Sequence, residues 1–250
     1  MDVQVKGTTM PVLEVVLAPG ERIVAEAGEL SWMTSSIRLR TSTQMAGSGG
    51  LLGAFKRTVG GGGLFMTEYS AQGWQGMVAF ATKLPGQIQH IRVEPDRAYL
   101  VHRHGFLCAT PGVELSLGFQ RRLGAGVFGG TGFVLQRVGG SADAWIELDG
   151  EVFSYDLTPN DVLRVHPGHV GMFEEQVRFD ITTVPGIANK LFGGDGLFLA
   201  TLTGPGRVWL QSLTLSNLAH ALQHYLVREE AGAAAAGGIA GAALKGIFRD

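Results

Sequence analysis

Histidine and cysteine are the residues that would carry metal or nucleophilic chemistry here, and the chain has seven of the first and one of the second. Three stretches that begin with a proline-led turn align with one another. The residue seven positions after each proline is Glu26, His102 or His166. One carboxylate with two imidazoles is the ligand set of a facial-triad iron site and also suits zinc. Glu26, His102 and His166 are therefore a candidate metal site; the alternative is that they point outward from separate strands.

Other histidines and the cysteine give weaker indications. His104 and His169 lie close to the candidate ligands in sequence and would add ligands or orient them. His220 and His224 are four residues apart on a predicted helix, which is a chelating spacing, but no glutamate lies between them in the zincin pattern. A solvated or interface face is the other interpretation of that pair. Cys108 lies in an apolar stretch, which indicates a buried, unreactive thiol.

Motifs of known catalytic or cofactor chemistry do not support an enzyme. Gly124–Gly129 has the spacing of a dinucleotide fingerprint, but that motif needs a helix after it, and here a strand is predicted. The sequence contains no Gly-x-Ser-x-Gly elbow, no Walker loop and no pair of cysteines. We therefore expect no enzyme activity and no cofactor.

The charge balance argues against nucleic acid as the main partner. Lysine and arginine number 20 against 22 aspartates and glutamates, for a formal net charge of −2. Basic residues do recur at matching places, namely Lys56, Arg57, Arg121, Arg122 and Lys190. On one face of a ring they would bind RNA or phospholipid headgroups, whereas a solvated rim is the simpler interpretation.

The elements that would position these residues repeat three times along the chain. Each copy has a proline-led turn, an apolar alternating run, a glycine-rich hairpin and a strand that bears a tryptophan. The turn prolines are Pro19, Pro95 and Pro159, and the glycine runs are Gly60–Gly63, Gly129–Gly132 and Gly193–Gly196. The sequence therefore predicts one all-β domain over residues 1–226, with repeats at about 10–86, 87–150 and 151–215.

The C-terminal end has a different pattern. Apolar residues recur at helical spacing over residues 214–229, so we predict a single α-helix there, capped by Ser216. Residues 230–250 are rich in alanine and glycine, a composition that suits close helix packing in a bilayer or an oligomer, or else a frayed tail.

The expected location is the cytoplasm. The first residues lack the basic and apolar regions of a signal peptide, and no stretch of about 18 apolar residues is present to span a bilayer. The single cysteine excludes an intramolecular disulfide and is compatible with a reducing compartment.

Several of these motifs together resemble a known family. They are the segment Ala27–Met33, the glycine-rich stretch Gly60–Phe65 and the segment Val165–Val170. The chain resembles an uncharacterised bacterial family related to the altered-inheritance-of-mitochondria protein, whose mitochondrial relative is linked to biogenesis. The resemblance implies β-sandwich units like those of the trp RNA-binding attenuation protein, assembled as a ring-like homotrimer. It supplies no catalytic residues.

The function we predict is that of a non-enzymatic oligomeric scaffold or binding protein, with a peripheral membrane or protein partner contacted through the Ala/Gly tail. Two alternatives remain open at this point. One is a ring protein that binds RNA or a small molecule, as the fold analogy suggests. The other is a metal-dependent enzyme that uses Glu26, His102 and His166.

Overall fold

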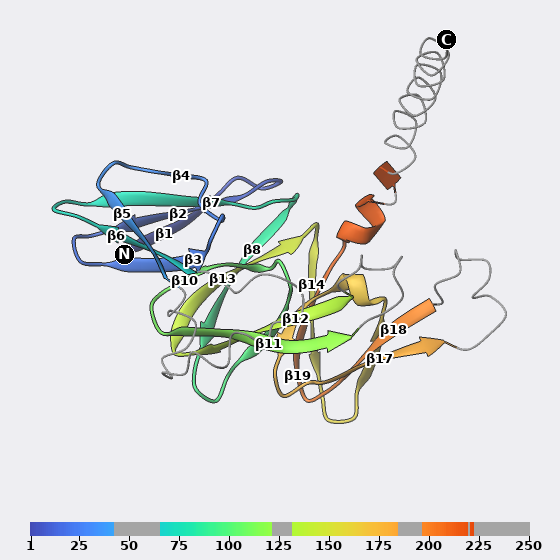
Figure 1. The fold of residues 1–250 in the computed structure, drawn as a ribbon. Helices are drawn as coiled ribbons and strands as arrows, with labels where there is room; N and C mark the ends of the chain where they lie inside the picture. The colour runs from blue at the N-terminus through green and yellow to red at the C-terminus, as the bar shows by residue number, and fades with distance from the viewer. Residues whose placement is uncertain (43–65, 122–131, 185–196, 220, 223–250) are drawn as a thin grey trace, which may run out of the picture. The chain divides into compact units, whose positions relative to one another are not determined.

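The computed structural model describes residues 1–42, 66–121, 132–184, 197–219 and 221–222 (Figure 1). Nearly all of these residues that lie in regular structure are in β-strands, and residues 215–219 and 221–222 are helical. The predicted all-β class with a C-terminal helix is therefore confirmed. The chain divides into a β unit, Met1–Leu213, and a second unit that begins at Thr214.

The strands follow one another along the chain in three groups of six, with β1 (Asp2–Lys6) ahead of them (Figure 1). The first group is β2 (Val12–Leu17), β3 (Arg22–Glu26), β4 (Trp32–Met33), β5 (Ile37–Ser42), β6 (Met66–Ala71) and β7 (Gly76–Ala81). The second is β8 (Gly86–Val93), β9 (Tyr99–His102), β10 (Phe106–Ala109), β11 (Val113–Arg121), β12 (Phe133–Gly140) and β13 (Ala142–Asp149). The third is β14 (Val152–Leu157), β15 (Val162–Val165), β16 (Val170–Glu174), β17 (Arg178–Val184), β18 (Leu197–Thr203) and β19 (Gly206–Gln211), with a 3-10 helix, η3 (Pro167–His169), before β16.

All three groups pair their strands in the same antiparallel order. One three-stranded set is β4-β7-β2 in the first group, β10-β13-β8 in the second and β16-β19-β14 in the third. The other set is β5-β6-β3, then β11-β12-β9, then β17-β18-β15. This is the pairing expected if the chain contains three copies of one β unit.

Strand pairing also joins each group to the next. β3 of the first group pairs with β10 of the second, and β9 of the second pairs with β16 of the third. The result is two six-stranded sheets that each draw on two groups, plus β1-β2-β7-β4 and a three-stranded sheet, β15-β18-β17. We call the pairings β3·β10 and β9·β16 the first and second junctions.

The proline-led turns set where the second strand of each group, β3, β9 or β15, begins. After Pro19, Gly20 has φ of 86°, and after Pro159, Asn160 has φ of 78°. Proline followed by a residue with positive φ is the pattern of a type II turn, and glycine and asparagine adopt that φ most readily. A backbone hydrogen bond of 3.0 Å, from Glu21 to Ala18, closes the first of these turns.

Each strand group buries a core of its own, because apolar side chains alternate along strands whose other face is more polar. The cores are also shared across the junctions. Trp145 and Cys108 of the second group pack in the core of the first, and Trp209 of the third packs against the core of the second. Burying one such aromatic side chain contributes about 3 kcal/mol. The groups are therefore held together by packing as well as by strand pairing.

The N-cap of the helix in the second unit lies two residues before the predicted cap. The hydroxyl of Thr214 accepts a hydrogen bond from the backbone N–H of Asn217 at 3.1 Å, which is the N-cap interaction. The predicted cap, Ser216, is wrong because Ser216 already lies within the helix. Among the described residues, no helix is both long and apolar enough to cross a membrane. The tail at 230–250 lies outside the described residues.

Candidate functional site

The three residues of the predicted metal site lie on three separate sheets. Glu26 ends β3, His102 ends β9, and His166 directly follows β15. The described part of the chain, which includes all three, contains no group of three or more His, Cys, Asp and Glu side chains that could hold a metal ion. Glu26, His102 and His166 occupy equivalent positions in the three strand groups, but the fold does not bring them together.

Glu26 instead forms a link across the first junction. Its Oε1 accepts a hydrogen bond of 2.7 Å from Nε2 of Gln136 on β12. Burial raises the pKa of the Glu26 carboxyl, and the hydrogen bond from Gln136 acts against that rise. The pair holds the end of β3 against a strand of the second group.

His102 and His169 play matching parts in successive groups. Nε2 of His102 lies 3.0 Å from the backbone carbonyl oxygen of Glu147, and Nδ1 of His169 lies 2.8 Å from that of Gln211. A carbonyl only accepts, so each ring nitrogen is the donor. Burial lowers the pKa of His102, which favours its neutral ring. His166 stands edge-on to His169, with ring centroids 5.9 Å apart.

A buried carboxylate that the sequence reasoning missed lies where the first group connects to the second. Glu147 on β13 has only 2% of its surface exposed. Its Oε1 accepts from Nζ of Lys83 at 2.6 Å, and its Oε2 accepts from the backbone N–H of Lys83 at 3.0 Å. The same ammonium lies 2.8 Å from Oε2 of Glu29. Lys83, Glu147 and Glu29 form what we call the Lys83 cluster.

The electrostatics of the Lys83 cluster follow from burial and pairing. Burial alone would lower the pKa of Lys83, but its hydrogen bonds to Glu147 and Glu29 outweigh that effect and raise it. Burial raises the pKa of Glu29, against the influence of Lys83. Burial, with the charge of Glu147 beside it, raises the pKa of Asp149 to about 6. The ammonium of Lys83 is therefore the charge that makes two buried carboxylates tolerable.

Gln211 on β19 takes the place of Glu147 at the second junction. Its Oε1 accepts from the backbone N–H of Asp149 at 3.1 Å, and its Nε2 donates to the backbone oxygen of Gly168 at 3.2 Å. Glu147 and Gln211 each lie two residues after the tryptophan of their strand. A polar residue at that place in an apolar strand is the sequence signal that would have found both.

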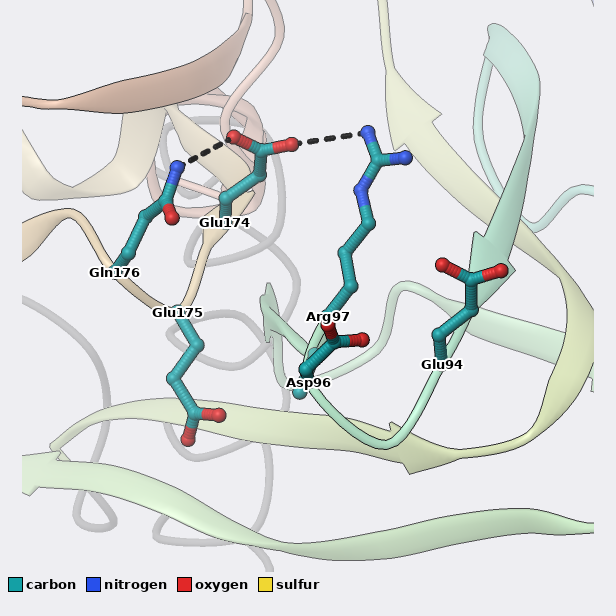
Figure 2. Close-up of a pocket in the computed structure, with 7 residues that line it drawn as sticks. Glu94, Asp96, Arg97, Glu174, Glu175 and Gln176 are labelled. Atoms are coloured by element: carbon teal, nitrogen blue, oxygen red, sulfur yellow. Dashed lines mark hydrogen bonds and ion pairs between the residues drawn. The ribbon is translucent and has the colours of Figure 1, made fainter.

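A surface pocket of about 240 Å³ lies at the second junction (Figure 2). It is lined by Glu94, Asp96, Arg97, Ala98, Glu174, Glu175 and Gln176. Figure 2 shows Glu174 between two partners: Oε1 lies 3.1 Å from Nη2 of Arg97, and Oε2 accepts from Nε2 of Gln176 at 3.3 Å. Glu175 makes a bidentate pair with Arg137, at 2.6 and 2.9 Å. These carboxylates therefore form ion pairs that join the second and third strand groups.

The remaining predicted candidates have ordinary surroundings or lie outside the described residues. His104 is exposed in the turn between β9 and β10. Cys108 is fully buried, and burial raises the pKa of its thiol well above the usual value, as expected of an unreactive cysteine. Arg121 pairs with Asp180 at 3.0 Å. Lys56, Arg57, Arg122, Gly124–Gly129, Lys190, His220 and His224 lie outside the described residues.

Known proteins share both the sequence pattern and the fold. An uncharacterised protein of Streptococcus pyogenes serotype M6 is 28% identical over 230 residues, which cover 86% of this chain and 87% of that protein. A crystal structure of a protein from Streptococcus pyogenes matches with a TM-score of 0.69 at 22% identity, over 90% of this chain and 99% of that one. The model of the family described as mitochondrial biogenesis AIM24 matches residues 3–213. The chain therefore belongs to the mitochondrial biogenesis AIM24 family.

Proposed function

We propose that this protein is a non-enzymatic scaffold or binding protein that works as a homo-oligomer, and as a homotrimer in line with the family resemblance. The observation that carries the proposal is the pair of hydrogen bonds that Lys83 donates to Glu147. Both oxygens of that carboxylate are already occupied by protein donors. A carboxylate that acts in catalysis must reach a substrate proton, whereas this one joins two parts of the fold.

The histidines support the same interpretation. His102 and His169 each donate a ring N–H to a backbone carbonyl in the last strand of a group. The bonded nitrogen of each ring is not available to a metal ion, and the other nitrogen belongs to no group of three or more metal-ligating side chains among the described residues. The side chains with the greatest potential for chemistry therefore form hydrogen bonds that hold the β unit together.

The test is metal content together with RNA binding. We expect protein dialysed against Zn²⁺ and then against buffer to retain no stoichiometric metal by plasma mass spectrometry. We also expect no retention of mixed RNA on filters at physiological salt. Stoichiometric zinc that disappears in His102→Ala and His166→Ala would contradict the proposal in favour of a metal site. RNA binding with a steep salt dependence would contradict it in favour of a phosphate-binding surface.

The proposed setting is the cytoplasm, with the Ala/Gly tail at 230–250 as the contact to a membrane surface or a protein partner. The small residues of that tail support close packing against another surface. Deletion of residues 231–250 should move the protein out of the membrane fraction of a cell lysate. An unchanged distribution between the soluble and membrane fractions would remove the membrane part of the proposal.

A further inference from the structure

Both junctions pair residues that occupy the same positions in the repeated sequence pattern. In the first junction Ala25 of β3 lies opposite Cys108 of β10, and in the second Val101 of β9 lies opposite Met172 of β16. Ala25 and Val101 each lie six residues after the turn proline of their group. A junction is therefore a defined register between one strand type and another, and the chain forms it twice.

A third junction of the same kind would need β15 of the third group and β4 of the first group. Among the described residues, each of these strands lacks a partner from another group. On β15 the equivalent residue is Val165, six residues after Pro159. On β4 it is Trp32, which lies opposite the last strand of its group as Cys108 and Met172 do. In the part of the chain that the structure describes, β15 pairs with β18 alone and β4 with β7 alone. Both strands are therefore open sheet edges.

Side chains in the two formed junctions are buried, whereas several of their counterparts on the open edges are exposed. Cys108 and Met172 are both 0% exposed within their junctions. Their counterpart Trp32 is 46% exposed, the next residue Met33 is 37% exposed, and Val162 on β15 is 55% exposed. Large apolar side chains on an unpaired edge strand are a surface that invites a further strand.

The backbone of β15 presents free groups in the right places. The carbonyl of Asp161 accepts a hydrogen bond of 3.1 Å from the first residue after β18, so it faces β18. Because backbone groups alternate along a strand, those of Val162 and Arg164 face the open side. In the second junction the counterpart of Val162 is Ala98, whose carbonyl already accepts a hydrogen bond of 2.9 Å from Glu175 of the third group.

The backbone N–H and carbonyl groups of β4 alternate so that its outward-facing residue matches one on β15. The N–H of Thr34 donates to the carbonyl of Met77 in β7 at 2.9 Å, so Thr34 faces β7. Met33 therefore presents its N–H and carbonyl to the open side. In the junction register Met33 falls opposite Arg164, and both residues have outward-facing backbone groups. Side-chain register and backbone alternation thus select the same alignment.

We propose that β4 of one copy pairs antiparallel with β15 of a second copy, with Trp32 opposite Val165 and Met33 opposite Arg164. This inference rests on the proposed homo-oligomer and names its contact surface. The occupant is a second copy because this chain carries both halves of the junction, while its own β4 and β15 belong to different sheets. Since the two edges differ, the contact is head-to-tail, and in the proposed homotrimer it closes into a ring.

Cysteine cross-linking tests the register directly. Trp32 and Val165 would form a pair that shares no backbone hydrogen bonds, with Cα atoms about 4.5 Å apart, a distance a disulfide can span. Differently tagged Trp32→Cys and Val165→Cys chains are co-expressed and oxidised, and we expect a disulfide between the two tags. Trp32→Cys with Val162→Cys is the off-register control, and wild type shows that buried Cys108 does not react. Equal yields from the two pairs would overturn the proposal.

A single proline substitution tests the same contact without new cysteines. Arg164→Pro removes an N–H that faces the open side, whereas Arg164→Ala keeps it, so the pair isolates one backbone donor. We expect the proline variant to be monomeric by native mass spectrometry and the alanine variant to assemble like wild type. Far-UV circular dichroism checks that both fold. An Arg164→Pro variant that is folded and fully assembled would contradict the proposal.

Failure of this contact is distinguishable from failure of the proposed function. A wild-type protein that is monomeric at all concentrations would contradict both. An oligomeric wild type in which Trp32→Cys and Val165→Cys chains do not cross-link would overturn only the β4–β15 contact. A chain with both substitutions that forms its disulfide within a monomer would place the pairing inside one chain and overturn the second copy as occupant.

Discussion

Glu147 and Lys83 are bonded twice, once through the side-chain ammonium at 2.6 Å and once through the backbone N–H at 3.0 Å. Lys83 lies between β7 and β8, and Glu147 lies on β13, so the pair fixes the connection between two strand groups. The side chain of Lys83 is about half exposed, whereas that of Glu147 is buried. The carboxylate thus depends on its partner far more than the ammonium does.

Substitution of Glu147 should destabilise the fold. We expect Glu147→Ala to lower the free energy of unfolding by about 2 kcal/mol, because the backbone donor and the ammonium of Lys83 lose their acceptor. Glu147→Gln should lose less, since an amide oxygen still accepts one bond. Urea unfolding measures both, with Glu114→Ala on the exposed side of β11 as the control, for which the change should stay below about 0.5 kcal/mol. Equal losses in Glu147→Ala and Glu114→Ala would refute the structural role.

Asp149 should make the fold less stable as the pH rises. Its folded pKa is raised to about 6 by burial and by the charge of Glu147, while an unfolded aspartate titrates near 4. Between about pH 4 and pH 6 the folded state therefore holds more protons than the unfolded state, and stability falls with rising pH. Asp149→Asn should remove this loss, so the advantage of the variant should grow from pH 4 to pH 6 and then level. A constant difference would contradict the burial of a protonated carboxyl.

His102 should produce a pH dependence of the opposite sign. Burial lowers its pKa below the usual value of about 6.5. The unfolded chain therefore gains a proton below pH 6.5 that the folded chain does not, and stability falls as the pH falls. His102→Gln keeps a side-chain N–H for the carbonyl of Glu147 but does not titrate. Chemical unfolding between pH 5 and pH 7 should show a shallower slope for the variant, and parallel curves would contradict a buried neutral imidazole.

Close packing at the second junction should make Gly171 sensitive to a single methyl group. A Cβ there would lie 2.9 Å from Cδ2 of Leu148 and 3.1 Å from the backbone oxygen of Trp209. Gly171→Ala should therefore cost about 1–3 kcal/mol through overpacking. Ser154→Ala on the exposed β14 is the control for thermal unfolding. A melting temperature unchanged in both variants would contradict the close packing at Gly171.

The sequence was informative about the fold and less so about the site. Pro19, Pro95 and Pro159, with the alternating runs after them, led to an all-β chain, because turn chemistry and side-chain alternation are local properties. The failure of Glu26, His102 and His166 to meet has a topological cause. Equivalent residues share a local environment, but the groups are joined by strand pairing, which places β3, β9 and β15 in different sheets.

The Lys83 cluster was missed for a related reason. Lys83 and Glu147 are 64 residues apart, and no local pattern pairs a residue between two strands with one inside a later strand. The available signal was Glu147 itself, a charged residue among the apolar positions of its strand, since such residues are almost never buried without a partner. The identity of that partner required the fold.

Native mass spectrometry of the untagged wild-type chain tests the central claim most directly, because it reports subunit number and bound mass together. The account predicts a homotrimer whose mass equals that of three chains, with no metal and no retained ligand. A monomer at every concentration would contradict the oligomer, and a stoichiometric metal or small-molecule mass would contradict the non-enzymatic scaffold.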